Sequence, residues 1–141
     1  MTFQVAVVGG GSWGTTVAHL VSHNFPTILW CRDSAVAKSI SQRSRNPKYL
    51  RKSKLHPGLK ASTDLKEAVF EADIVLMAIP SQSYRDVLHK LLPLSKPNIP
   101  IISLTKGLEQ GTNLTMTQII GIESPGRPTG VLTGPNLAAE V

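Results

Sequence analysis

The chain has 141 residues, 41% of them hydrophobic, which is enough for one domain with a core and too little for two ordinary domains. No apolar run approaches the roughly 20 residues that cross a bilayer, so we expect no stable membrane insertion. The single cysteine, Cys31, favours a reducing compartment, most simply the cytoplasm. The net charge is +6, and seven Lys and Arg residues with no acid fall within 43–60.

Five runs of apolar, β-forming residues are typical of strands that are buried on both faces of a sheet. They lie at 3–8, 27–31, 73–79, 99–105 and 130–134. Helix signals fall between them, and this alternation indicates βαβ units with right-handed crossovers. The sequence therefore predicts an α/β fold with a doubly wound, mostly parallel sheet, forming one Rossmann-like domain over 1–141.

Helices are predicted from apolar spacing and from capping residues. An apolar stripe follows the first strand, and Asp64 with Glu67 resembles a capping box. The stripe consists of Trp13, Val17, Ala18, Leu20 and Val21; further helices are expected after Asp33 and Ser34, after Asp64, from Ser81 or Ser83 through Leu92, over 112–121, and from near Leu137.

The basic segment 43–60 has no clear period and contains Pro47, Pro57 and Gly58, which indicates a long loop inserted within the domain. Its charge would attract phosphate or nucleic acid, or would simply be solvated. The segment has one aromatic residue and no recognised nucleic-acid-binding motif, so we expect no nucleic-acid partner.

Histidines give no sign of a metal site. His19 and His23 are four residues apart on the first predicted helix, but no third ligand accompanies them, so we interpret them as surface residues. His56 and His89 have no evident role. We therefore predict no metal.

Gly9, Gly11 and Gly14 form the pattern G-x-G-x-x-G between the first strand and the first helix. In a dinucleotide site the first glycine makes the tight turn, the second admits the pyrophosphate, and the third lets the helix approach the sheet. The helix N-terminus then offers free N–H groups and a positive dipole end to phosphate. Because a buried strand precedes the pattern and an amphipathic helix follows it, we predict dinucleotide binding, with Gly10 as additional flexibility.

The end of the second strand distinguishes the two nicotinamide cofactors. An acid there binds the ribose 2′-OH of NAD, whereas an Arg suits the 2′-phosphate of NADP. Arg32 and Asp33 both occupy this position, and Asp33 is also a good N-cap for the next helix. We favour NADP, used as NADPH, with NAD as the alternative.

Six segments occur in an order that resembles the N-terminal domain of bacterial-type NAD(P)-dependent sn-glycerol-3-phosphate dehydrogenases. They are GGGSWGTTVA, LWCRD, NPKYL, ADIVLMAIPS, SLTKGLE and LTGPNLAAEV. The resemblance implies the reversible reduction of dihydroxyacetone phosphate to sn-glycerol 3-phosphate by NAD(P)H, serving glycerophospholipid synthesis. Its partner would be this phosphorylated triose or glycerol substrate, and the full-length enzyme is expected to be a homodimer.

The resemblance also implies roles for single residues. Lys106 would be a catalytic residue that contacts both cofactor and substrate, which suits its place after a parallel strand. Asn136 stands where many members have Ser, and its amide retains hydrogen-bonding capacity. The remaining implied contacts are Ser12, Trp13, Arg32, Tyr49, Pro80 and Ala138 with the cofactor, and Gly134 and Asn136 with the substrate.

Family members continue into an all-helical second domain, which supplies a further lysine and most phosphate-binding groups. We therefore expect this chain to be a fragment, incomplete at its C-terminus and inactive by itself, of a parent dehydrogenase. The alternative is a non-catalytic Rossmann module that senses nucleotides. Lys106 and the GPN segment argue against it, because a sensor does not need them.

Overall fold

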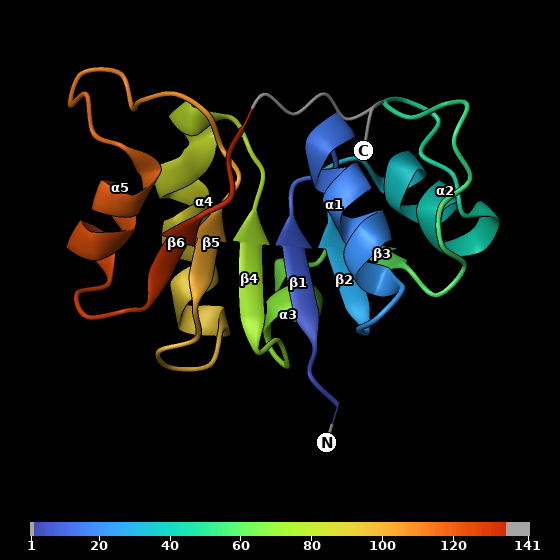
Figure 1. The fold of residues 1–141 in the computed structure, drawn as a ribbon, viewed down its shortest axis with the longest axis horizontal. Helices are drawn as coiled ribbons and strands as arrows, with labels where there is room; N and C mark the ends of the chain where they lie inside the picture. The colour runs from blue at the N-terminus through green and yellow to red at the C-terminus, as the bar shows by residue number, and fades with distance from the viewer. Residues whose placement is uncertain (1, 135–141) are drawn as a thin grey trace.

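Six parallel strands form one sheet in the computed structural model, which describes residues 2–134 (Figure 1). The strand order is β3-β2-β1-β4-β5-β6, and every neighbouring pair is parallel. This order reverses direction at β1 and β4, as in the doubly wound fold, and it confirms the predicted class. The strands are β1 (Val5–Val8), β2 (Thr27–Trp30), β3 (Lys60–Ser62), β4 (Ile74–Met77), β5 (Ile101–Ser103) and β6 (Thr129–Val131).

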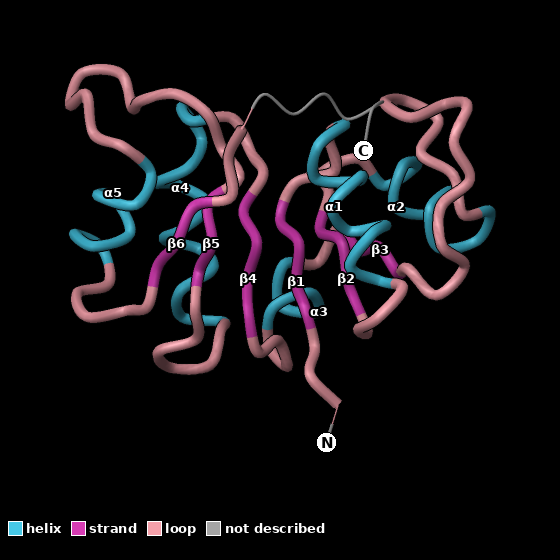
Figure 2. Tube along the Cα trace, in the orientation of Figure 1, coloured by secondary structure: helices cyan, strands magenta, loops and turns pink. Residues whose placement is uncertain are grey.

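Helices cover both faces of this sheet (Figure 2). One face packs against α1 and α2, and the opposite face packs against α3, α4 and α5. None of the helices within 2–134 has the length and apolar character of a bilayer span. The helices are α1 (Ser12–Ser22), α2 (Ser34–Arg43), α3 (Leu65–Val69), α4 (Tyr84–Leu91) and α5 (Met116–Glu123), with short 3-10 turns η1 (Ser81–Ser83) and η2 (Leu92–Leu94).

Strand β1 is apolar throughout because both of its faces are buried. Val5 and Val7 enter the core beneath α1 and α2, whereas Ala6 and Val8 enter the core beneath α3 and α4. All four residues are buried because successive side chains of a strand point to opposite faces. The prediction of a strand that is buried on both faces is therefore confirmed.

Three local predictions need correction. Leu20 is 40% exposed, because the buried face of α1 includes Val17 and Ala18 but not Leu20. Glu67 completes no capping box: Asp64 accepts from the backbone of Lys66, but the backbone N–H of Asp64 donates to Ser62 Oγ. The serines proposed as caps before α4 make no capping hydrogen bond there.

Several boundaries differ from the sequence interpretation, most clearly for the helix expected over 112–121, which is α5 (Met116–Glu123). The basic segment contributes Arg43 to α2 and Lys60 to β3, so the connection between them is the 44–59 loop. Strand β3 was not predicted, because Lys60–Ser62 carries no apolar run and pairs only at the edge of the sheet. The helix expected near Leu137 lies outside the described residues.

Helix α1 approaches the sheet at Gly14. An ideal Cβ at Gly14 would lie 1.9 Å from the carbonyl oxygen of Gly9 and 3.2 Å from the Cβ of Ala78. Both contacts involve groups fixed by the sheet, so the helix itself would have to move. This agrees with the expected role of the third glycine in helix–strand packing.

Replacing Gly14 with Ala should therefore lower the free energy of unfolding by about 1–3 kcal/mol, the usual cost of overpacking. The matched control is Gly121→Ala in α5, where an added Cβ meets nothing within 4 Å. That change should raise stability by about 0.5–1 kcal/mol, because Ala favours helices over Gly. Urea unfolding measures both, and a Gly14→Ala chain as stable as the parent would contradict the packing argument.

Candidate functional site

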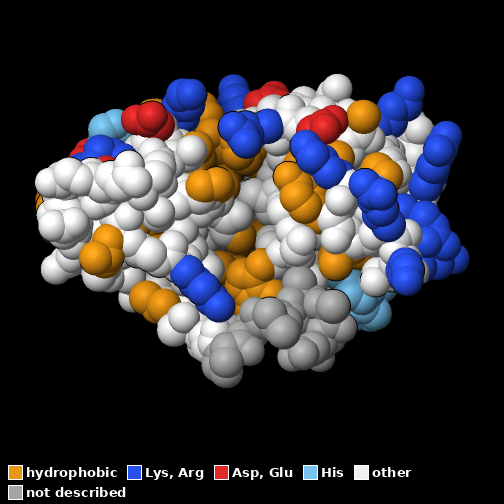
Figure 3. All heavy atoms as spheres, turned by 90° about the horizontal axis from the view of Figure 1, so that it is seen from above, with side chains coloured by type: hydrophobic (Ala, Val, Ile, Leu, Met, Phe, Trp, Pro, Cys, Tyr) orange, Lys and Arg blue, Asp and Glu red, His pale blue; other side chains and the backbone are white. Residues whose placement is uncertain are grey.

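A cavity of about 520 Å³ opens at the carboxyl ends of β1, β2 and β4. Open α/β sheets bind ligands at this edge, where the strand order reverses. Figure 3 looks down on this edge and shows Lys and Arg side chains gathered on the side of α2 and the 44–59 loop. The cavity is lined by Gly9, Gly10, Gly11, Trp30, Cys31, Arg32, Asp33, Val36, Lys48, Tyr49, Ala78, Ile79 and Pro80.

The glycine turn forms the floor of this cavity. Gly9 has a φ of 125°, and a Cβ there would lie 2.1 Å from the carbonyl oxygen of Ala78. At Gly11 an added Cβ would meet nothing within 4 Å, so the space above this residue is open to a ligand. Gly10 is more than flexible: its Cβ would lie 2.4 Å from the Cβ of Cys31, so Gly10 lets β1 and the end of β2 meet closely.

Helix α1 begins at this floor with its amide groups directed at the same edge. Its N-cap is Gly11, no side chain among the described residues caps it, and its first turn carries no acid. Uncapped amides and the positive end of the helix dipole suit an anion such as pyrophosphate. With the open space at Gly11, the residues present fit the phosphates of a dinucleotide.

A second cavity of about 340 Å³ adjoins the first. Ala78, Ile79 and Pro80 line both cavities, so the two cavities share one wall. The second cavity is otherwise lined by Trp13, Leu104, Thr105 and Lys106. An elongated ligand along this edge would therefore pass from the glycine turn to Lys106.

Contacts from η1 and from the residues between β4 and η1 fix the backbone on both sides of Lys106. Thr105 donates from Oγ1 to the carbonyl oxygen of Ile79 at 2.7 Å. Gln82 then donates to the carbonyl of Leu108 and accepts from the backbone N–H of Gln110. The lysine is thus exposed on a segment that is anchored on both sides.

Arg85 of α4 adds an ion pair to this segment. Its Nε and Nη2 donate to Glu109 at 2.8 and 2.9 Å, and its Nη1 donates to Glu123 of α5. The hydrogen bonds from Arg85 and Thr112 lower the pKa of Glu109 to about 2. Sequence reasoning missed this pairing, because Arg85 and Glu109 are 24 residues apart and no local pattern joins them.

At the end of β2, Asp33 caps α2 as predicted. Its Oδ1 accepts from the backbone N–H groups of Ala35 and Val36 at 2.9 and 3.3 Å. Arg32 beside it is exposed and lines the first cavity. Burial, and secondarily the charge of Asp33, raises the pKa of the Cys31 thiol to about 11, so this cavity-lining sulfur stays neutral at physiological pH.

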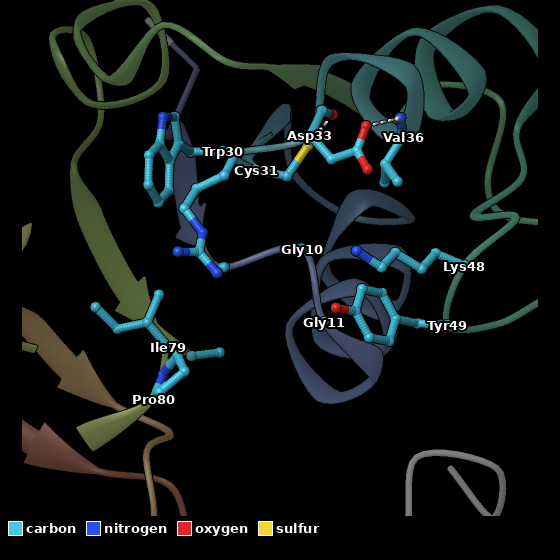
Figure 4. Close-up of a pocket in the computed structure, with 13 residues that line it drawn as sticks. Gly10, Gly11, Trp30, Cys31, Asp33, Val36, Lys48, Tyr49, Ile79 and Pro80 are labelled. Carbon is cyan, nitrogen blue, oxygen red and sulfur yellow. Dashed lines mark hydrogen bonds between the residues drawn. The ribbon is translucent and has the colours of Figure 1, made fainter. Parts of the chain in front are cut away.

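The 44–59 loop brings two side chains to the same cavity. Figure 4 shows Lys48 and Tyr49 on one side, Ile79 and Pro80 on the other, and the glycine turn between them. Tyr49 was a predicted site residue, but Lys48 was not, because an exposed lysine in a charge-rich loop has no distinguishing pattern. The Asn-Pro pair at 46 and 47 was the available turn signal.

Histidines gather where α1 meets this loop. The backbone N–H of His56 donates to Nδ1 of His19 at 2.8 Å, and the ring of His23 lies between the other two rings, with centroids 4.9 and 4.5 Å away. His56 therefore has a structural contact that the sequence did not indicate. Within 2–134, no group of three or more His, Cys, Asp or Glu side chains is arranged to hold a metal ion.

The predicted site residues fall into four groups. Gly9, Gly11, Arg32, Asp33, Tyr49 and Pro80 meet at the first cavity, while Trp13, Pro80 and Lys106 meet at the second. Ser12 and Gly14 belong to the start of α1, and neither they nor Gly134 lines these two cavities. Asn136 and Ala138 lie outside the described residues.

Comparisons with known proteins agree on one family. Residues 4–141 match the model of the NAD-dependent glycerol-3-phosphate dehydrogenase N-terminus. A glycerol-3-phosphate dehydrogenase (NAD(P)+) of Sphingopyxis alaskensis is 48% identical over 141 residues, covering 100% of this chain and 42% of the relative. One of Mycobacterium bovis is 48% identical over 139 residues, covering 98% and 41%.

Solved structures show the same likeness. The crystal structure of glycerol-3-phosphate dehydrogenase from Coxiella burnetii superimposes with a TM-score of 0.90 at 29% identity. That match covers 99% of this chain and 43% of the other. The chain thus spans about two-fifths of the length of the relatives that it matches.

The histidine contact predicts a pH dependence. Burial, and then the neighbouring charges of His23 and His56, lowers the pKa of His19. The unfolded chain then binds more protons than the folded chain, so stability should fall as pH drops below about 6.5 and level off below the lowered pKa. His19→Asn retains an acceptor for His56 without titrating, so it should flatten this dependence between pH 7 and 5 in urea unfolding. An unchanged slope would contradict the assignment.

Proposed function

The chain belongs to the NAD-dependent glycerol-3-phosphate dehydrogenase family, whose N-terminal region it matches over residues 4–141, and on this premise we propose that it is the cofactor-binding domain of an enzyme that interconverts dihydroxyacetone phosphate and sn-glycerol 3-phosphate. The observation that carries the proposal is the shared wall of Ala78, Ile79 and Pro80. It joins a phosphate-binding floor to a cavity that contains Lys106, so one ligand can reach both.

In this proposal the glycine turn and α1 bind the cofactor phosphates. Gly9 makes the turn, Gly11 leaves room for the pyrophosphate, and the amides from Ser12 onward donate to it. Gly14 holds α1 in place for this contact. When bound, NAD(P)H supplies the hydride that reduces the substrate ketone.

Trp13 and Lys106 serve the reacting end. The ring of Trp13 lines the second cavity and excludes water from one side, while Pro80 ends the wall between the cavities. Lys106 provides a cation for the substrate phosphate or for the negative charge that develops on the ketone oxygen. Gly134, Asn136 and Ala138 stay predictions, the first two for substrate and the third for cofactor.

The cofactor proposal favours NADPH and keeps NADH as the alternative. Arg32, Lys48 and Tyr49 all line the first cavity. Among the lining residues within 2–134, Asp33 is the only acid, and it uses one carboxylate oxygen to cap α2. Two cations and a partly engaged acid suit a 2′-phosphate better than a free ribose diol.

The wider context follows from the family. A phosphorylated small-molecule substrate, a homodimer of the full-length enzyme, a role in glycerophospholipid synthesis and a cytoplasmic location all remain predictions. Membership in a dehydrogenase family disfavours the alternative of a nucleotide-sensing module. Because proton transfer and most phosphate contacts are expected elsewhere in the full-length enzyme, we predict no useful turnover by these 141 residues alone.

Titration with NADPH and NADH tests the proposal. Trp30 lines the first cavity and Trp13 the second, so their fluorescence reports on both. Arg32→Ala should weaken NADPH binding about tenfold or more and NADH binding little, since it removes one charge-assisted hydrogen bond. Arg43→Ala, at the exposed end of α2 and outside the cavity lining, is the matched control. Failure of the parent chain to bind either cofactor would overturn the proposal.

A further inference from the structure

Asn46 is a fully buried polar residue at the start of the 44–59 loop, with 0% of its surface exposed. Its Nδ2 donates to the carbonyl oxygen of Gly10 at 3.1 Å and to Oγ1 of Thr15 at 2.9 Å. Its Oδ1 accepts from the backbone N–H groups of Lys48 and Tyr49, both at 3.1 Å. Two donors and two acceptor positions are all that a side-chain amide offers, so every one is used.

These four bonds join two segments that are far apart in the sequence. Gly10 and Thr15 belong to the phosphate-binding floor and the first helix, whereas Lys48 and Tyr49 belong to the loop. An antiparallel bridge between Asn46 and Leu50 closes the loop tip on itself. The amide therefore sets where the tip stands relative to the cavity floor.

The side chains carried by this tip are not held by the core. Tyr49 is 47% exposed, Lys48 is exposed, and the Nζ of Lys48 lies 5.5 Å from the centroid of the Tyr49 ring. Both line the first cavity, opposite Pro80. Exposed side chains of this kind contact a ligand without a large entropic loss only if their backbone is already placed.

We propose that Asn46 is a positioning residue for the cofactor: it contacts none of the ligand and acts by fixing Lys48 and Tyr49 against the adenosine half of a bound dinucleotide. We assign the adenosine half because Arg32 and Asp33 line the same cavity at the end of β2. The adenosine ribose lies at this strand end in this fold. The ammonium of Lys48 suits a phosphate and the ring of Tyr49 suits adenine or ribose. This inference rests on the proposed function and adds a determinant of affinity to it.

A purely structural role would give a different result in a double-mutant cycle. The cycle uses Asn46→Ala, the pair Lys48→Ala and Tyr49→Ala, and all three together, with NADPH affinity measured by fluorescence. If Asn46 acts through the two side chains, the single change and the pair should each weaken binding about tenfold, and the triple variant should be no weaker than the pair. If the triple variant instead loses affinity by the product of the two separate losses, the inference is overturned.

Stability must be separated from affinity, because Asn46→Ala leaves buried polar groups unpaired. Urea unfolding without ligand gives the folded fraction of each variant, and each measured affinity is corrected for that fraction. If Asn46→Ala does not fold, Thr15→Val replaces it in the cycle: this isostere removes one partner of the amide and should behave in the same direction, and multiplying losses in that cycle again overturn the inference. Asn24→Ala, in the exposed turn after α1 and outside the cavity lining, is the matched control and should change nothing.

The two proposals fail in different ways. If the parent chain binds neither NADPH nor NADH, the proposed function and this inference both fail. If the parent binds a cofactor and the cycle is additive, only the role of Asn46 fails. The fragments 2′,5′-ADP and 5′-AMP complete the test: equal losses for both in Lys48→Ala assign the lysine to the 5′-phosphate, and a loss for 2′,5′-ADP alone assigns it to the 2′-phosphate.

Discussion

The site depends on how closely β1, α1 and β4 pack at the glycine turn. Gly9 passes the carbonyl of Ala78, and Gly14 brings α1 against the carbonyl of Gly9, at distances that no side chain would permit. Ala78 begins the wall that both cavities share. The contact that completes the core between these elements is therefore also the contact that shapes the floor and wall of the site, so the two cannot vary independently.

Much of this fold could be predicted because its signals are local. The buried strands read as continuous apolar runs, and the glycine spacing marks a strand-to-helix turn because an apolar run precedes it and an amphipathic pattern follows it. Edge strand β3 was not predicted, because it carries no local signal. Lys60–Ser62 has no apolar run of its own, and it becomes a strand only because Ile28–Trp30 offer it a parallel partner.

The candidate site likewise contains residues that local sequence predicts and residues that only the folded structure reveals. Residues next to the glycine turn or at strand ends, such as Arg32 and Lys106, follow from position in the sequence. Asn46 does not, because its bonds to Gly10 and Thr15 span 36 and 31 residues and exist only once the loop has folded back over α1. The contact of His56 with His19 across 37 residues is of the same kind.

Among residues 2–134, no ion pair attaches the 44–59 loop to the rest of the domain. Within the described residues, every ion pair joins Arg85, His89 or Lys96 to an acid outside this loop. The loop is held instead by hydrogen bonds of Asn46 and His56 and by the buried side chains of Leu55 and Leu59. Dissolved salt screens the attraction of its cations for an anion beyond about 8 Å at physiological ionic strength, but hardly affects such neutral contacts. Ionic strength thus governs how fast an anionic ligand arrives, while the shape of the site that receives it stays the same.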